Sequence, residues 1–319
     1  MTDVTERPAE RPQGRRRPSV DVKTPLEERP IRTVDAPMTS PSSTTGLLEV
    51  FRRRYLLRLL VSREISARYQ GSFLGLLWSY INPLSQFVIY YFVMGVIFGL
   101  HKGVENFAIH MFCGIVIVHF FNETFNAGTR SIVRNKSLVQ KMAMPREMFP
   151  VASMLVSAYH LIPELIILVV VGALLGWTPT MAGIAALVAS LAICMVLGTG
   201  LALMFATANV FFRDVGNFVS IITNFVRFGV PMMYPYTMVQ DRFGEFAEFY
   251  LWNPISVACL LFQQAFWVGT TKDPEATAAA HLPADLWAYT AIGIVVSLIV
   301  LGIGQLIFSR TENRIPERL

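Results

Sequence analysis

Five ionisable residues lie within long apolar stretches of this sequence, where an unpaired charge is costly. His119 and Glu123 are four residues apart, as are His160 and Glu164, so each pair would share one face of a helix. Arg227 is the fifth. A charged side chain at the centre of a bilayer costs roughly 2.5–3.5 kcal/mol, so these groups should face protein or water. They predict either a polar path through a membrane or intramembrane pairing that fixes helix packing.

Motifs for catalysis and nucleotide binding are missing from the sequence. It contains no G-x-x-x-x-G-K-[ST] phosphate loop, no G-x-S-x-G nucleophile elbow and no Cys/His cluster with metal-ligand spacing. Its three cysteines, Cys113, Cys194 and Cys259, all lie in apolar segments, which favours small packing residues over a disulfide framework. We therefore expect no catalytic residue, metal or cofactor in this chain.

The composition indicates an all-α integral membrane protein. Hydrophobic residues make up 53% of the 319 positions and charged residues only 15%, whereas a soluble domain usually carries about 25% charged residues. Residues 1–45 differ, being rich in Pro, Arg, Ser, Thr and Glu, and this composition predicts a disordered cytoplasmic tail. Because the basic residues of the remainder lie beside apolar segments, the net charge of +5 indicates contact with lipid rather than nucleic acid.

The apolar stretches predict six membrane spans, since a spanning helix needs about 20 apolar residues. A sixth stretch, 217–235, contains one Arg and two Pro, and a seventh, 254–268, is too short to span and suits a re-entrant helix. Ahead of the first span, residues 46–70 form an expected amphipathic interfacial helix, with Leu47, Phe51, Tyr55 and Leu59 repeating every four residues. The five clear spans are 80–100, 107–127, 148–176, 181–209 and 286–308.

Charges in the connections predict the orientation of the spans. The 128–147 loop carries five Lys and Arg residues against one Glu, which places it in the cytoplasm. The segments 236–252 and 270–285 are poor in Lys and Arg, so both flanks of 254–268 are expected outside. The prediction is a multi-pass protein of the inner (plasma) membrane with both termini cytoplasmic and an external re-entrant gate region over 236–285.

Aromatic residues are dense at the membrane entry and in two of the predicted spans. Such faces would offer stacking surfaces to a moving sugar chain, and core packing is the alternative interpretation. The residues that we assign to a substrate path are Trp78, Tyr80, Phe87, Tyr90, Tyr91, Phe225 and Phe228.

Four motifs, in order along the chain, connect the sequence to a known family. They are the opening segment with Arg68-Tyr69, Leu77-Trp78 and Asn82-Pro83, the 135–146 loop ending in Pro145-Arg146, the Arg213-Asp214 pair, and Trp252-Asn253-Pro254. Together they make residues 47–315 resemble the permease subunits of type-2 ABC exporters for polysaccharides, the class that exports O-antigen, teichoic acid or galactan.

The resemblance implies that residues 46–319 are a transmembrane domain that works as a homodimer with two separate ATPase subunits, which would hold ATP and Mg²⁺. The cargo would be a lipid-linked polysaccharide, and the long Arg/Pro-rich tail favours a cell-wall galactan. Two alternatives remain open: a membrane-embedded enzyme acting on lipid-linked sugars, and a channel or carrier without ATP. The residues implied in ATPase coupling are Asn135, Leu138, Lys141, Pro145 and Arg146, and those implied at the gate or entry are Arg68, Tyr69, Trp252, Asn253 and Pro254.

Overall fold

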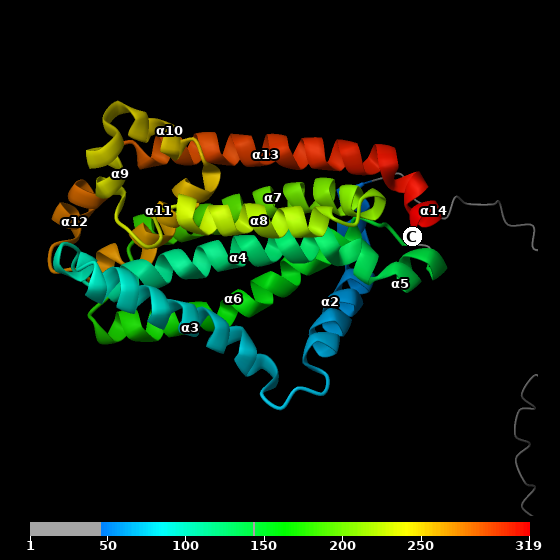
Figure 1. The fold of residues 1–319 in the computed structure, drawn as a ribbon, viewed down its shortest axis with the longest axis horizontal. Helices are drawn as coiled ribbons and strands as arrows, with labels where there is room; N and C mark the ends of the chain where they lie inside the picture. The colour runs from blue at the N-terminus through cyan, green and yellow to red at the C-terminus, as the bar shows by residue number, and fades with distance from the viewer. Residues whose placement is uncertain (1–45, 143) are drawn as a thin grey trace, which may run out of the picture. The chain divides into compact units, whose positions relative to one another are not determined.

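A computed structural model describes residues 46–142 and 144–319, and within these ranges all regular secondary structure is helical (Figure 1). The predicted tail, 1–45, lies outside the described residues. Helices that are long and apolar enough to cross a membrane number five in the described part of the chain, and they confirm the all-α membrane class. They are Gly75–Ile97, which contains α3 (Trp78–Tyr90) and a π-helical segment (Tyr91–Ile97), α4 (Phe107–Arg134), α6 (Met148–Leu174), α7 (Met181–Phe211) and α13 (Leu286–Thr311).

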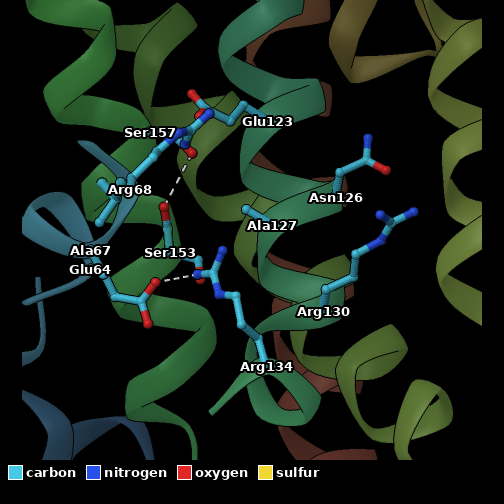
Figure 2. A pocket seen from close by; sticks show the side chains of 11 residues that line it. Glu64, Ala67, Arg68, Glu123, Asn126, Ala127, Arg130, Arg134, Ser153 and Ser157 are labelled. Carbon is cyan, nitrogen blue, oxygen red and sulfur yellow. Dashed lines mark hydrogen bonds and ion pairs between the residues drawn. The ribbon is translucent and has the colours of Figure 1, made fainter. Parts of the chain in front are cut away.

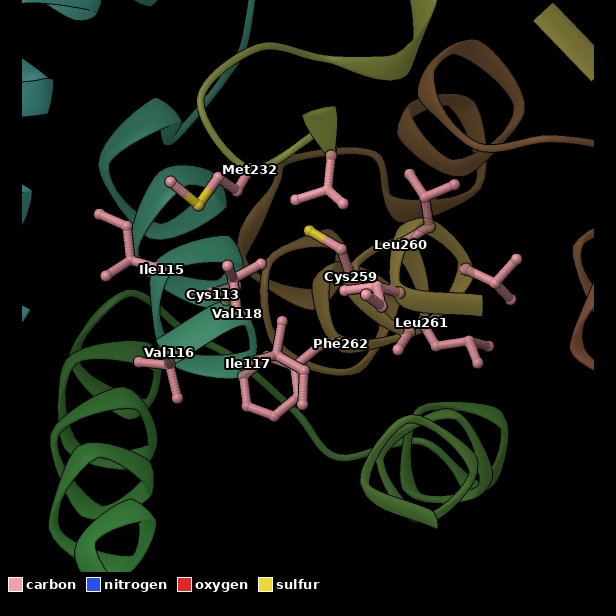
Figure 3. Packing of buried hydrophobic residues seen from close by; sticks show 14 of the residues in the cluster. Cys113, Ile115, Val116, Ile117, Val118, Met232, Cys259, Leu260, Leu261 and Phe262 are labelled. Carbon is pink, nitrogen blue, oxygen red and sulfur yellow. The ribbon is translucent and has the colours of Figure 1, made fainter. Parts of the chain in front are cut away.

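Helix α4 is the central element of the bundle. In an apolar 18-residue stretch of α4, 83% of the residues are buried. The corresponding value for the span that contains α3 is 11%, so α3 is peripheral. Around α4 pack α6, α7, α8 (Val215–Gly229) and α11 (Pro254–Phe266). The apolar core forms where α4 meets α11, and Cys113 and Cys259 lie within it as buried free thiols (Figure 3).

The helix at the sixth predicted span is shorter than the predicted 217–235 stretch. Helix α8 has 15 residues and rises about 22 Å, less than the roughly 30 Å of a bilayer core. After it the chain is non-helical and returns into the bundle beside Gly114, where an added Cβ would lie 2.5 Å from Met232 Cα. The carbonyl oxygen of Pro231 accepts a hydrogen bond of 2.8 Å from Gln263 Nε2. That bond gives the Pro231 carbonyl a hydrogen-bond partner, which the lipid of a bilayer cannot provide.

Helix α11 does not run the length of the bundle. Asn253 caps its start by accepting a hydrogen bond from the Ile255 amide, and Pro254 occupies the first helical position, which suits a residue without an amide proton. Figure 1 shows the helices that flank α11 together at one end of the bundle, and α5 (Lys136–Lys141) and α14 (Ile315–Arg318) at the other. The flanking helices are α9 (Tyr236–Phe243), α10 (Ala247–Leu251) and α12 (Pro274–His281).

The two ends of the bundle differ in charge. We call the end with α9, α10 and α12 the acidic end, because Asp241, Glu245, Glu248, Asp273, Glu275 and Asp285 lie there. We call the end with α5 and α14 the basic end, because Arg134, Lys136, Lys141, Arg213, Arg310 and Arg318 lie there.

The expected interfacial helix consists of two helices, α1 (Leu47–Arg52) and α2 (Arg54–Tyr69), with a break at Arg53. Their buried side chains, among them Val50 and Leu57, pack against the basic end of the bundle. Phe51, Tyr55 and Leu59 are exposed, as expected for an interfacial helix whose apolar face contacts lipid.

Helices α7 and α13 touch backbone to backbone. A Cβ atom added to Gly304 would collide with the carbonyl oxygen of Gly200, and one added to Gly200 would lie 2.7 Å from the backbone of Leu301. Small residues at such crossings let membrane helices approach closely. Only glycine therefore fits at both positions.

Candidate transport pathway

A polar stripe runs along one face of α4. Its members recur every three or four residues, so they lie on one side of the helix. The first three are half-buried and the last two are exposed, although most of the helix is buried. We define the polar stripe as His119, Glu123, Asn126, Arg130 and Arg134.

Three members of the polar stripe bond to α2 and α6. Glu123 Oε1 accepts hydrogen bonds from Arg68 Nη1 at 2.5 Å and from His160 Nδ1 at 2.9 Å. Tyr69 extends this network, with its hydroxyl 2.8 Å from His160 Nε2 and 2.5 Å from Ser79 Oγ of α3. Glu123 therefore joins α2, α4 and α6 at one point.

The same side of the polar stripe holds two further ion pairs. His119 Nδ1 lies 3.3 Å from Glu164 Oε1 of α6, and Arg134 forms an ion pair with Glu64 of α2. These contacts connect α6 to the His119 end of the stripe and α2 to the Arg134 end.

The remaining members of the stripe bond to α8. Asn126 Nδ2 donates to Thr223 Oγ1 at 2.9 Å, and Arg130 Nη2 donates to both the Gly216 carbonyl and Ser220 Oγ at 2.9 Å. The partners of the polar stripe thus lie on α2 and α6 on one side and on α8 on the other, and we call the stripe together with these partners the seam.

A pocket of about 590 Å³ opens along this seam (Figure 2). In the figure Glu64 and Arg68 project from α2 on one side, and Asn126 and Arg130 point toward the opposite side. Three arginines and two glutamates line it, together with the hydroxyls of Ser153 and Ser157. A smaller pocket of about 180 Å³ adjoins Arg68 and Glu123 and reaches Trp78 and Asn82 of α3. These cavities can hold a polar, anionic group within the membrane-length part of the bundle.

The structure corrects the pairing that the sequence spacing favoured. Histidine and glutamate do not pair within one helix; instead they cross between helices, as His160 with Glu123 and His119 with Glu164. Arg227 is half-buried on α8 and forms no ion pair with another described residue. The loop predicted over 128–147 starts too early, because α4 continues to Arg134 and therefore carries Arg130 and Arg134 on the same helix as the rest of the polar stripe.

The aromatic residues assigned to a path fall into two groups. Phe87 and Tyr91 pack against α4, with ring centroids 5.4 Å from Phe112 and 6.2 Å from Phe107, and Tyr90 also borders the core. Phe225 and Phe228 project from α8 and are 74% and 58% exposed, so they are available to a partner or a cargo. Trp78 is exposed beside the smaller pocket, and Tyr80 is half-buried.

The residues implied in ATPase coupling lie in different environments at the basic end. Asn135 is buried, donates to Glu64 Oε1 at 2.7 Å and accepts from Arg63, while Pro145 is buried and Leu138 half-buried. Arg146 donates to the carbonyl oxygen of Glu312, beyond the end of α13. Burial and the nearby Glu147 raise the pKa of the Glu312 carboxyl, and Arg146 opposes this shift. Of the five residues, Lys141 alone is exposed.

The implied gate residues at the acidic end do not meet Arg68 and Tyr69, which belong to the seam. Trp252 is 63% exposed and packs 5.7 Å from Phe249, whereas Asn253 and Pro254 start α11. Gln263, which holds the Pro231 carbonyl, was not among the predicted residues. The Gln263-Gln264 pair in the otherwise largely apolar 254–268 run was the signal that could have found it.

A bundle of membrane-length helices with a polar, cavity-lined seam on its central helix is the architecture of a membrane transport protein. The chain belongs to the ABC-2 type transporter family, whose model matches residues 55–267. Membership of this family makes it a transporter membrane subunit and not an enzyme.

Two curated relatives are similar over most of their length. An O-antigen export system permease protein of Myxococcus xanthus is 29% identical over 246 residues, covering 76% of this chain and 93% of the relative. A protein of the same name from Klebsiella pneumoniae is 25% identical over 265 residues, covering 83% of this chain and 95% of the relative.

Proposed function

We propose that this chain is the membrane-spanning subunit of an ATP-driven exporter that moves a lipid-linked polysaccharide across the inner membrane. The relatives are named as O-antigen export permeases. The observation that carries the proposal is the polar stripe of α4, because it stays partly accessible on the side of the bundle. Lipid cannot solvate such groups, so the stripe has to face water, cargo or another protein surface.

A second copy of the chain would close the pathway. Apolar faces of the first span and of α8 flank the seam. Their exposed side chains include Val88 on α3, Phe92 on the π-helical segment that follows it, and Phe218, Ile221 and Phe225 on α8. A homodimer that brings two such faces together encloses two polar stripes in one channel. The six-span count belongs to this proposal, with α8 and the 230–235 segment together forming the sixth crossing.

The basic end is proposed to lie in the cytoplasm, because Lys and Arg are retained on that side of a membrane. Both termini are then cytoplasmic, and the α9–α12 region forms an external gate. An ATPase subunit would dock on α5, whose Lys136 and Lys141 are exposed, and would bind ATP and Mg²⁺ itself.

The cargo would enter beside α2. A diphosphate that links a glycan to its lipid is anionic, and Arg130 in the 590 Å³ pocket offers a guanidinium group, which binds phosphate well and here bonds only neutral oxygens. Arg68 and Arg134 line the same pocket, paired with Glu123 and Glu64. A cell-wall galactan remains our proposal for the glycan.

The test is reconstitution of the complex. The full chain, co-expressed with an ABC ATPase from the same genome and purified through its own tag, is expected to retain that ATPase. In proteoliposomes the complex should then move a lipid-linked glycan only with ATP. Absence of a stable complex, or equal transport without ATP, contradicts the proposal.

The coupling segment gives two separable predictions. Lys141→Glu should weaken ATPase binding without changing the stability of the permease, because the side chain is exposed. Arg146→Ala should lower both coupling and stability, the latter by about 1–2 kcal/mol, because it removes the bond to the Glu312 carbonyl. ATP hydrolysis and export are measured in parallel, with Lys272→Glu at the acidic end as the control. Normal export by both variants would remove α5 and its loop from the coupling path.

The exposed aromatic pair on α8 provides a test of the pathway face. The double variant Phe225→Ala/Phe228→Ala should lower export about 5- to 150-fold, if each ring contributes about 0.5–1.5 kcal/mol to contacts along the path. Thermal stability of the chain should barely change, because both rings are exposed. Leu298→Ala/Ile299→Ala on the exposed face of α13 is the matched control. Equal losses in the two double variants would show that α8 has no special role.

A further inference from the structure

A second groove lies between α2 and α6 and is almost entirely apolar. Its volume is about 420 Å³, within the range of ligand sites in proteins. Aliphatic side chains from both helices line it: Leu57, Val61 and Ile65 from α2, and Leu155, Ala158 and Ile162 from α6. The dimensions and lining suit a hydrocarbon chain.

The contact between α2 and α6 separates this groove from the polar pocket. On α6 the groove uses Leu155, Ala158 and Ile162, whereas the polar pocket uses Ser153 and Ser157, and the two pockets share no residue. A molecule in the groove therefore lies outside the proposed path of the cargo. The occupant is then a resident molecule and not a passing one.

Two arginines stand at the edge of the groove. Arg54 and Arg58 are four residues apart on α2, so they project from one face, and both are exposed. Three other arginines near α2 have carboxylate partners: Arg53 pairs with Glu49, Arg68 with Glu123 and Arg134 with Glu64. Arg63 of α2 instead donates to the side-chain oxygen of Asn135. Arg54 and Arg58 form no ion pair with the residues that the structure describes, so two cations remain available beside an apolar slot.

We propose that this groove binds one anionic phospholipid, with an acyl chain between α2 and α6 and the phosphate between Arg54 and Arg58. Arginine binds phosphate with paired hydrogen bonds, and basic side chains at a membrane surface attract anionic lipid. The lipid would hold α2 in the headgroup plane, next to the residues that join α2 to the seam. The inference rests on the proposed function only in placing α2 at the membrane surface.

The experiment measures lipid retained by the full chain. Protein reconstituted in mixed phosphatidylglycerol and phosphatidylcholine nanodiscs, then extracted in mild detergent, is examined by native mass spectrometry. We expect one retained phosphatidylglycerol per chain. Arg54→Gln/Arg58→Gln should lower the retained ratio of phosphatidylglycerol to phosphatidylcholine about 10- to 30-fold, as two charges at about 1 kcal/mol each imply. Ala158→Trp, which fills the groove without changing charge, should also abolish retention.

The matched control is the double variant Arg52→Gln/Arg310→Gln, which removes two exposed arginines that do not line the groove. It should retain phosphatidylglycerol like the unmodified chain. An equal loss in the control, or full retention by Ala158→Trp, overturns the proposal, as does preferential retention of an added polyprenyl phosphate over phosphatidylglycerol. Lipid binding needs neither ATPase nor glycan, so its outcome is independent of the transport assay.

Discussion

Gly304→Val should prevent α13 from packing on α7. The added Cβ would meet the carbonyl oxygen of Gly200, and because that atom belongs to backbone it cannot rotate away. Forcing extra carbon atoms into a filled contact costs about 1–3 kcal/mol or more, so we expect a loss at the upper end, about 3 kcal/mol. In detergent the unfolding midpoint should fall by about 6 °C or more, measured by thermal aggregation of the purified chain.

The control for this prediction lies two residues away. Gly302 is on the same helix, and nothing lies within 4 Å of the place its Cβ would occupy. Gly302→Ala should leave the midpoint unchanged or raise it, because alanine favours a helix over glycine. A midpoint for Gly304→Val equal to that for Gly302→Ala would show that the two helices are not in backbone contact.

Glu123→Gln should reduce export at least tenfold while the chain still folds. The substitution removes the anion that holds Arg68 of α2 and His160 of α6, and hydrogen bonds to charged groups contribute about 1.5–3 kcal/mol each. The Arg68 side chain is 46% exposed, so its share lies below that range. Release of Arg68 would free the end of α2 beside the polar pocket. The measurements are ATP-dependent glycan transport and the unfolding midpoint in the same preparation.

Two further variants define the role of Glu123. Glu275→Gln, at an exposed site on α12, removes one negative charge at the acidic end and should export normally. Glu123→Asp keeps the charge on a shorter side chain and should recover part of the activity. Full export by Glu123→Gln would mean that the seam does not contribute to transport.

The five long spans could be predicted because apolar length alone specifies them. The predicted end of α4 was wrong because Arg130 and Arg134 resemble loop residues. A long arginine side chain can reach polar surroundings while its backbone stays helical, so the helix continues to Arg134. The polar stripe was hidden by that boundary. Its partners, such as Ser220 and Gly216 on α8, could not be predicted, because residue spacing within one segment does not show which other helices pack against it.

Two other differences have local causes. The predicted span 217–235 ran through Pro231, and the residue before a proline is driven out of the helical region. Val230 accordingly has φ −121° and ψ 155°, which ends α8. The pairing of His119 and His160 was assigned within helices, since a sequence shows i and i+4 neighbours but not which helix lies across from them.

The glycine contact between α7 and α13 also limits how this molecule can work. Two helices whose main chains meet have no soft side chains between them to absorb sliding or rotation. Opening and closing during a transport cycle would therefore occur by movement of the less tightly packed peripheral helices, α3 and α8, relative to α7 and α13. Probes of distance change placed on α3 and α8 would then report the cycle, and the same probes on α7 and α13 would serve as the stationary reference.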